Sequence, residues 1–233
     1  MITRMKYIDY HDYMHKDAII YAYLQNNFPY IRKRIKAWES FTLDREDILL
    51  VKSGAIFEEI SGKKKGIARC FFSKSLIFPT RNQIVLKAFE TSEICFINAE
   101  TAFGKLEKDQ ILSNFFLQIA EKNEEDMRRQ AFLGTENSKN KIISTLNFLL
   151  ENNKSNNKTP IFPEWLQINV LAQLANCSIS TISSTVNELH AEGILDIKSS
   201  PWKLKGREKR IEILENEHQK IKLNERKHKS NVF

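Results

Sequence analysis

The chain has 233 residues, a formal net charge of +7 at pH 7 and a pI near 9.2. Hydrophobic residues make up 42% of it and aromatic residues 10%, which excludes a disordered chain and suffices for two domains with separate cores. No apolar run approaches a membrane span and the N-terminus lacks the apolar segment of a signal peptide, so we expect a cytoplasmic protein that does not bind membranes.

The N-terminal part predicts one helix followed by short strands. Residues 17–27 form the best helical segment of the first thirty. From residue 31 to 98 short runs of alternating apolar and polar residues follow, rich in β-branched and aromatic side chains. The predicted strands are 34–38, 47–60, 66–72, 83–89 and 93–97, with a glycine-bounded turn at 61–66. Closely spaced strands without intervening helices predict an antiparallel sandwich, roll or barrel.

Helical patterns begin after the last of these strands. Residues 99–106 predict a short helix and residues 108–133 a long one, in which Ile111, Phe115 and Ile119 recur at four-residue spacing. The part after Ala120 is strongly charged. A helix that leaves its domain to pair with a second copy of itself has this pattern, and so does an amphipathic helix lying on the strands. We expect the pairing, and hence a homodimer.

Two helices joined by a tight turn are predicted over residues 170–195. Leu171, Leu174 and Ala175 form one apolar stripe, and Asn169 is the expected N-cap before it. Asn176 lies where the chain must turn, and asparagine adopts a left-handed conformation at low cost. The apolar face of the second helix carries Ile179, Ile182, Val186 and Leu189.

The opposite face of that second helix is polar, short-chained and uncharged. It carries Ser180, Thr181, Ser183, Ser184 and Asn187. A helix of this kind can enter a DNA groove. A purely structural helical hairpin has the same two stripes, so the pattern alone leaves both interpretations open.

The residues that follow favour DNA binding. Gly193 ends the second helix, residues 194–198 alternate like a strand, 199–209 are polar and basic, and 210–214 alternate again. Helix, turn, helix, strand, basic loop, strand is the order of a winged helix-turn-helix. The preceding helix at 139–150 and the polar segment 151–160 place a domain boundary near residues 134–139.

Taken in this order, the chain resembles the Crp/Fnr family of bacterial transcription regulators. The similar residues are concentrated in the predicted helix-turn-helix: Ala172, Cys177-Ser178, Thr181-Ile182, Leu189 and Glu192-Gly193-Ile194. The predicted strands and residues 115–125 are similar to the PrfA-like branch of activators. The resemblance implies an α+β fold with a cyclic-nucleotide-binding-like β-roll (1–107), a long dimerisation helix and hinge (108–137) and a C-terminal winged helix-turn-helix (138–233).

The resemblance also implies a homodimeric transcription regulator that binds double-stranded DNA and contacts RNA polymerase. The chain departs from the cyclic-nucleotide members at Phe78-Pro79, where a phosphate cradle would need glycine and a carboxylate. No cysteine precedes Cys70, which excludes the N-terminal iron–sulfur site of the oxygen-sensing members. We therefore expect no cofactor, and a small effector other than cyclic AMP where one exists. Its predicted pocket positions are Lys64, Arg69, Phe71 and Phe72.

The recognition helix departs from the family as well. Family members place arginines on this helix that can bind guanine, and the matching positions here are Ile179 and Ser184. No Lys or Arg occurs from Val170 through Ile197. Base choice is then expected from Ser180, Thr181, Ser183, Ser184 and Asn187, with thymine-methyl packing and DNA shape. The expected phosphate contacts are Lys139, Lys141, Lys198, Lys203, Lys205 and Arg207.

Other observations restrict the alternatives. The positive charge fits a partner carrying phosphates but is spread along the chain. Cys70, Cys95 and Cys177 have no metal-ligand spacing and are expected as buried or half-buried thiols. No nucleophile–base pair or phosphate loop stands out, so we expect no enzymatic activity. A ligand-binding sensor that acts through protein contacts, with a degenerate helix-turn-helix, remains the alternative hypothesis.

Overall fold

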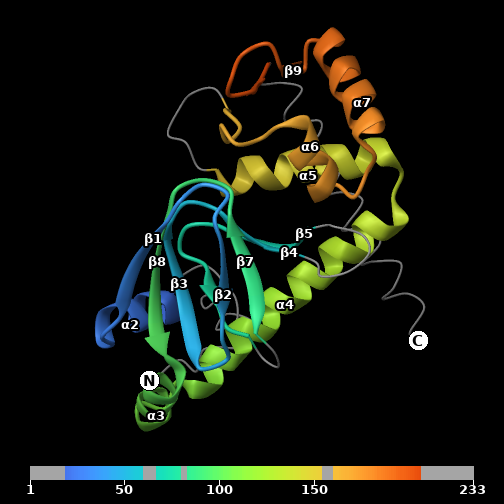
Figure 1. Cartoon of the computed structure of the whole chain (residues 1–233). Helices are drawn as coiled ribbons and strands as arrows, with labels where there is room; N and C mark the ends of the chain where they lie inside the picture. The colour runs from blue at the N-terminus through green and yellow to red at the C-terminus, as the bar shows by residue number, and fades with distance from the viewer. Residues whose placement is uncertain (1–18, 60–66, 80–82, 154–159, 206–233) are drawn as a thin grey trace, which may run out of the picture. The chain divides into compact units, whose positions relative to one another are not determined.

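The computed structural model describes residues 19–59, 67–79, 83–153 and 160–205 (Figure 1). The chain forms two compact units, Met1–Gln130 and Ala131–Phe233. Within the described residues, no helix is both long and apolar enough to cross a membrane.

The first unit contains two antiparallel sheets, each with four described strands. One sheet has the order β1-β8-β3-β6 and the other β2-β7-β4-β5. The strands are β1 Ile31–Ile35, β2 Ser40–Leu43, β3 Asp47–Ser53, β4 Ile56–Glu59, β5 Ile67–Phe71, β6 Leu76–Ile77, β7 Ile84–Ala88 and β8 Ser92–Asn98. The predicted antiparallel architecture is confirmed.

Strand β3 is buried on both faces because its side chains alternate between two cores. Leu49 and Val51 belong to the core formed by residues of both sheets. Ile48 and Leu50 belong to a second core with residues of three helices. These helices are α2 (Ile19–Asn27), α3 (Ala99–Lys108) and α4 (Leu112–Thr135). One apolar run in the sequence therefore holds the sheets and the helices of this unit together.

The long helix begins later than predicted. Helix α3 continues to Lys108, so the predicted start at that residue is wrong, and α4 begins at Leu112. The chain turns between them at Gln110, with φ 59°, and the Ile111 amide donates to the carbonyl of Leu106 (2.9 Å). The apolar spacing continues across this turn because Ile111 packs against the same core. The apolar spacing in the sequence therefore does not reveal the turn at Gln110.

The predicted strand 47–60 is also two strands. Gly54 has φ +91° and separates β3 from β4. The chain changes sheets there, since β3 pairs with β8 whereas β4 pairs with β5 and β7. A β-carbon on Gly54 would lie 2.2 Å from Ser92 Oγ and 2.8 Å from Ser92 Cα. Only glycine fits this crossing without displacing β8.

Two strands were not predicted, and one was displaced. Strands β2 and β6 have no counterpart among the predicted ranges, and predicted strand 34–38 lies at Ile31–Ile35 in the structure. Strand β1 buries only Ile35 and exposes its other residues. Its charged sequence therefore lacks the alternation of a half-buried strand.

The second unit consists of helices packed together and a short strand pair. The helices are α5 (Ser138–Asn152), α6 (Ile168–Leu174) and α7 (Ile179–Ala191), and each packs against the other two (Figure 1). Asn137 begins α5 by accepting a hydrogen bond from the Asn140 amide (2.9 Å). The buried side chains include Ile142, Leu149, Leu171, Ile182, Val186 and Leu189.

The strand pair consists of β9 (Leu195–Asp196) and β10 (Lys203–Leu204), with Lys203 opposite Asp196. Strand β10 lies in the segment predicted as a basic loop, which corrects that prediction. The predicted second strand at 210–214 lies outside the described residues. On its other side β10 meets residues 160–162, where the Leu204 amide donates to Pro160 (3.1 Å) and the Phe162 amide to Trp202 (3.0 Å).

Replacing Gly54 with alanine is expected to lower the free energy of unfolding by about 2–4 kcal/mol, because the β-carbon adds backbone strain and a clash. The matched control is Gly104→Ala in α3, where a β-carbon meets nothing within 4 Å and about 0.5–1 kcal/mol of stabilisation is expected. Urea denaturation of both variants measures the difference. Equal stabilities would contradict the assigned sheet crossing.

Candidate nucleic-acid interface

A left-handed residue joins α6 to α7. Asn176 has φ 51°, as predicted, and the following Cys177 amide donates to the carbonyl of Ala172 (3.0 Å). Ala172 is buried, so its small side chain leaves room for the returning chain. This turn fixes the point at which α7 begins.

The predicted N-cap of α6 is wrong. The helix begins at Ile168 after Gln167, and the side chain of Gln167 makes no capping hydrogen bond. Asn169 lies inside the helix, where its Oδ1 accepts from the Val170 amide (2.9 Å). Its side chain bonds the next amide instead of one two or three residues on, so it cannot act as the cap.

Ser178 caps α7 and ties together the hydroxyls of its first turn. Its Oγ accepts from the Thr181 amide (3.1 Å) and lies 2.8 Å from both Ser180 Oγ and Thr181 Oγ1. This network satisfies an amide that would otherwise lack a partner at the helix start. The first turn of α7 is therefore capped and rich in hydroxyls.

The predicted polar face of α7 is accessible. Ser180, Ser184 and Asn187 are exposed, and Thr181 and Ser183 are half-buried. The opposite face is buried at Ile182, Val186 and Leu189. Ile179 was predicted on this apolar face, but its side chain is 60% exposed. It occupies the first helical position, beyond the part of α7 that the core covers.

An acidic residue that the sequence analysis missed lies on the exposed side of α7. Ser184 Oγ donates to Glu188 Oε1 (3.3 Å). The four-residue spacing of Ser184 and Glu188 could have predicted this contact, because residues i and i+4 lie together on one face of a helix. The Ser184 hydroxyl is therefore already engaged with a carboxylate.

The predicted phosphate-binding lysines lie on two parts of this unit. Lys139 and Lys141 are in the first turn of α5, and Lys139 Nζ lies 3.8 Å from Glu192 Oε1. Lys205 is exposed after β10 and its Nζ lies 3.7 Å from Asp196 Oδ2. Lys198 is exposed and Lys203 half-buried. Arg207 lies outside the described residues.

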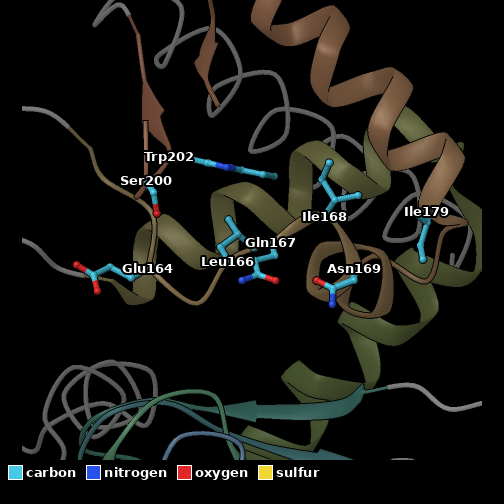
Figure 2. Close-up of a pocket in the computed structure, with 8 residues that line it drawn as sticks. All are labelled: Glu164, Leu166, Gln167, Ile168, Asn169, Ile179, Ser200 and Trp202. Carbon is cyan, nitrogen blue, oxygen red and sulfur yellow. The ribbon is translucent and has the colours of Figure 1, made fainter. Parts of the chain in front are cut away.

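An open hollow of about 480 Å³ lies beside the start of α7 (Figure 2). Ile179 and Glu164 lie at opposite ends of it in this view. Its lining residues are Glu164, Leu166, Gln167, Ile168, Asn169, Ile179, Ser200 and Trp202. This hollow was not predicted from the sequence, because Trp202 lies in a segment predicted to be a polar loop.

The predicted effector positions have different surroundings. Arg69 Nε donates to Asp126 Oδ2 (2.7 Å) on α4, and its guanidinium lies 5.0 Å from the centre of the Phe71 ring. Phe71 itself is buried in the core formed by residues of both sheets. Phe72 is half-buried, and its amide donates to Ser75 Oγ (3.0 Å). Lys64 lies outside the described residues.

Burial also affects ionisable groups near Arg69. It raises the pKa of the Glu58 carboxyl, an effect that the Arg69 charge opposes and Asp126 reinforces. Burial raises the pKa of the Cys70 thiol to about 11. Cys95 is also buried and Cys177 is half-buried, which confirms the prediction for the thiols. The described residues contain no cluster of three or more metal-ligating side chains.

Comparisons with solved structures identify the fold. No family model matches the sequence, and no curated protein does. FixK2 from Bradyrhizobium japonicum is similar in structure with a TM-score of 0.67 and 11% identity, over 79% of this chain and 96% of that chain. The global regulator CLP of Xanthomonas campestris, described as responsive to c-di-GMP, has a TM-score of 0.62 and 17% identity, over 81% and 98%.

A third neighbour carries the family description itself. A transcriptional regulator of the CRP/FNR family from Thermus thermophilus has a TM-score of 0.61 and 15% identity, over 79% of this chain and 98% of that chain. At these identities the likeness concerns the fold, and it confirms the predicted mixture of helices and antiparallel sheets. The chain has the fold of Crp/Fnr transcription regulators.

Proposed function

We propose that the chain is a sequence-specific DNA-binding transcription regulator of the Crp/Fnr type that acts as a homodimer. The observation that carries the proposal is the exposed polar face of α7, a capped helix that carries no Lys or Arg and on which Ser180, Ser184 and Asn187 are accessible. The regulators that share its fold support the same conclusion.

In this proposal α6 and α7 are a helix-turn-helix and the β9–β10 pair is its wing. Helix α7 enters the major groove and its polar side chains contact base edges. Two copies read half-sites about one helical turn, roughly 34 Å, apart. Because hydroxyls donate and accept hydrogen bonds, they select bases less strongly than a bidentate arginine. DNA shape therefore contributes to the choice of site.

The lysines provide affinity that does not depend on sequence. Lys139, Lys141, Lys198, Lys203 and Lys205, with Arg207 beyond the described residues, neutralise phosphates in this proposal. Two of them face carboxylates at 3.7–3.8 Å, Lys139 with Glu192 and Lys205 with Asp196. In both pairs the lysine is exposed and the N···O distance is long, so the pairing is weak and a phosphate can replace the carboxylate at low cost.

Helix α4 supplies the surface for the dimer. Its first half is anchored in the first unit by Phe115, which is fully buried. Phe116 is 45% and Met127 is 65% exposed on the same helix. Apolar side chains left in water on a long helix favour pairing with a second copy.

Control by a small effector other than cyclic AMP is part of the proposal. Arg69 on β5 pairs with Asp126 on α4, so a ligand that bound Arg69 would compete with this contact. Such a ligand would shift the population of dimer conformations that present α7 to DNA. Contact with RNA polymerase and membership of the PrfA-like branch stay predictions.

Removing the hydroxyls of α7 tests the proposed reading face. With a duplex selected from random DNA, we expect Ser180→Ala, Thr181→Ala and Ser184→Ala together to weaken binding about 10- to 100-fold, because several base contacts of ~1 kcal/mol each are lost. Ser40→Ala, at an exposed serine on β2 of the first unit, is the matched control and should bind normally. If the full chain selects no duplex even at low salt, the proposal fails in favour of a sensor that acts through protein contacts.

Replacing Lys203 and Lys205 with alanine should weaken binding to all sequences. The slope of log Kd against log salt is expected to fall by about 2, roughly one for each lost phosphate contact. The double variant Lys33→Ala, Lys36→Ala removes two exposed lysines of the first unit and serves as the control. An altered sequence preference with an unchanged slope would contradict the phosphate assignment.

Placing a charge at Met127 tests the dimer. Met127→Asp is expected to produce monomers in sedimentation experiments and to abolish binding to a two-half-site duplex, because α4 could no longer bury its apolar face. Ile31→Asp, at a position 74% exposed on β1, is the control and should leave the dimer intact. A Met127→Asp protein that sediments like the unmodified chain would refute the proposed pairing.

A further inference from the structure

Ile179 is unusual for its exposure at the start of α7. Its side chain is 60% exposed, and no other large apolar side chain among the described residues of the second unit is as exposed. It also lines the hollow together with Ile168 and Trp202 (Figure 2). Apolar surface is therefore gathered where the proposed recognition helix begins.

The neighbouring hydroxyls at this end of the helix are partly occupied. Ser178 Oγ holds the Thr181 amide and lies 2.8 Å from the hydroxyl oxygens of Ser180 and Thr181. Residues 179–187 carry no charge. No side chain in this stretch can form the bidentate charged contact with guanine that arginine makes. The side chain that remains exposed for contact at the N-terminus of α7 is that of Ile179.

Thymine offers the chemical partner for this side chain. Its C5 methyl is the apolar group on the base edges of the major groove, and apolar side chains contact it there. The N-terminal residues of a recognition helix approach the bases closely. Isoleucine is β-branched and has few rotamers, so ordering it against a methyl group costs little entropy.

We propose that Ile179 is a specificity-determining residue that packs against a thymine methyl in each half-site. The inference rests on the proposed DNA-binding function and names what its recognition helix selects. Cytosine, which lacks the methyl and presents an amino group, is disfavoured at that position because the amino group would lose its water against the isoleucine.

The test removes the methyl from the DNA and the isoleucine from the protein. In a selected duplex, each thymine is replaced in turn by deoxyuridine, which differs only at C5. For the unmodified chain we expect one position in each half-site at which Kd rises about fourfold, the effect of one buried methyl. For Ile179→Ala the same replacement should leave Kd unchanged, and the two changes together should be non-additive.

Three controls separate the outcomes. Ile31→Ala removes an isoleucine of similar exposure from the first unit and should retain the full deoxyuridine effect. Thermal unfolding of Ile179→Ala should match that of the unmodified chain, since the side chain is mostly exposed. Ile179→Val, which keeps the branched methyls, should retain most of the effect.

The possible failures are distinguishable. If no duplex is selected, both the proposed function and this inference fall. If a duplex is selected but deoxyuridine affects Ile179→Ala and the unmodified chain equally, DNA binding stands and the role of Ile179 is refuted. If Ile179→Ala binds DNA normally but regulates transcription from its target promoter poorly, the exposed isoleucine makes a protein contact instead. That result would also overturn the inference.

Discussion

The left-handed conformation of Asn176 is the constraint on which the proposed interface depends. A right-handed residue at this position would continue α6 and would direct the chain away from the Ala172 carbonyl that now accepts the Cys177 amide. Asparagine adopts this conformation at lower cost than most residues. Because the turn ends within two residues, Ser178 can cap α7 at once. The direction of α7, and therefore the side chains it exposes, follows from that turn.

In the proposed function, the helix that results discriminates weakly between bases, and hydrogen bonds from Ser178 hold its first turn. The hydroxyls of Ser180 and Thr181 bond to that of Ser178, and the hydroxyl of Ser184 bonds to the carboxylate of Glu188. A serine or threonine accepts as readily as it donates, so it distinguishes bases less well than a charged, planar group. The apolar side chain of Ile179 is proposed to distinguish thymine from cytosine by its C5 methyl, which hydroxyl groups do not do. In this proposal, discrimination comes from methyl contact and DNA shape together, and affinity comes from lysines outside the helix.

Elements whose apolar spacing is repeated over several turns or strands could be predicted from the sequence. The buried stripe of α7 at Ile182, Val186 and Leu189 was predicted, as was the left-handed Asn176. Positions that depend on tertiary contacts were not predicted. The sheet crossing at Gly54 depends on the approach of Ser92, which is distant in sequence. The break at Gln110 is hidden, because Ile111 on its far side serves the same core.

Three errors concern the candidate site itself. Ile179 has the spacing of a core residue, but helical periodicity does not tell where the covering structure ends, and the buried face of α7 begins one turn after it, at Ile182. Asn169 has the side chain of a cap, but it bonds to its neighbouring amide within the helix. Strand β10 was predicted as part of a loop because its two residues, Lys203 and Leu204, are too few to reveal alternation.

The central claim is that the exposed face of α7 lies against base edges in the major groove. Attaching an iron–EDTA group to Asn187→Cys tests it directly, in a chain whose half-buried Cys177 is replaced by serine and whose other thiols are buried. Our account predicts cleavage of the selected duplex in two clusters roughly 34 Å apart, one for each half-site. The same group at Lys33→Cys should cleave far less. Equal cleavage from both positions, or none from Asn187→Cys on a duplex that the protein binds, would contradict the account.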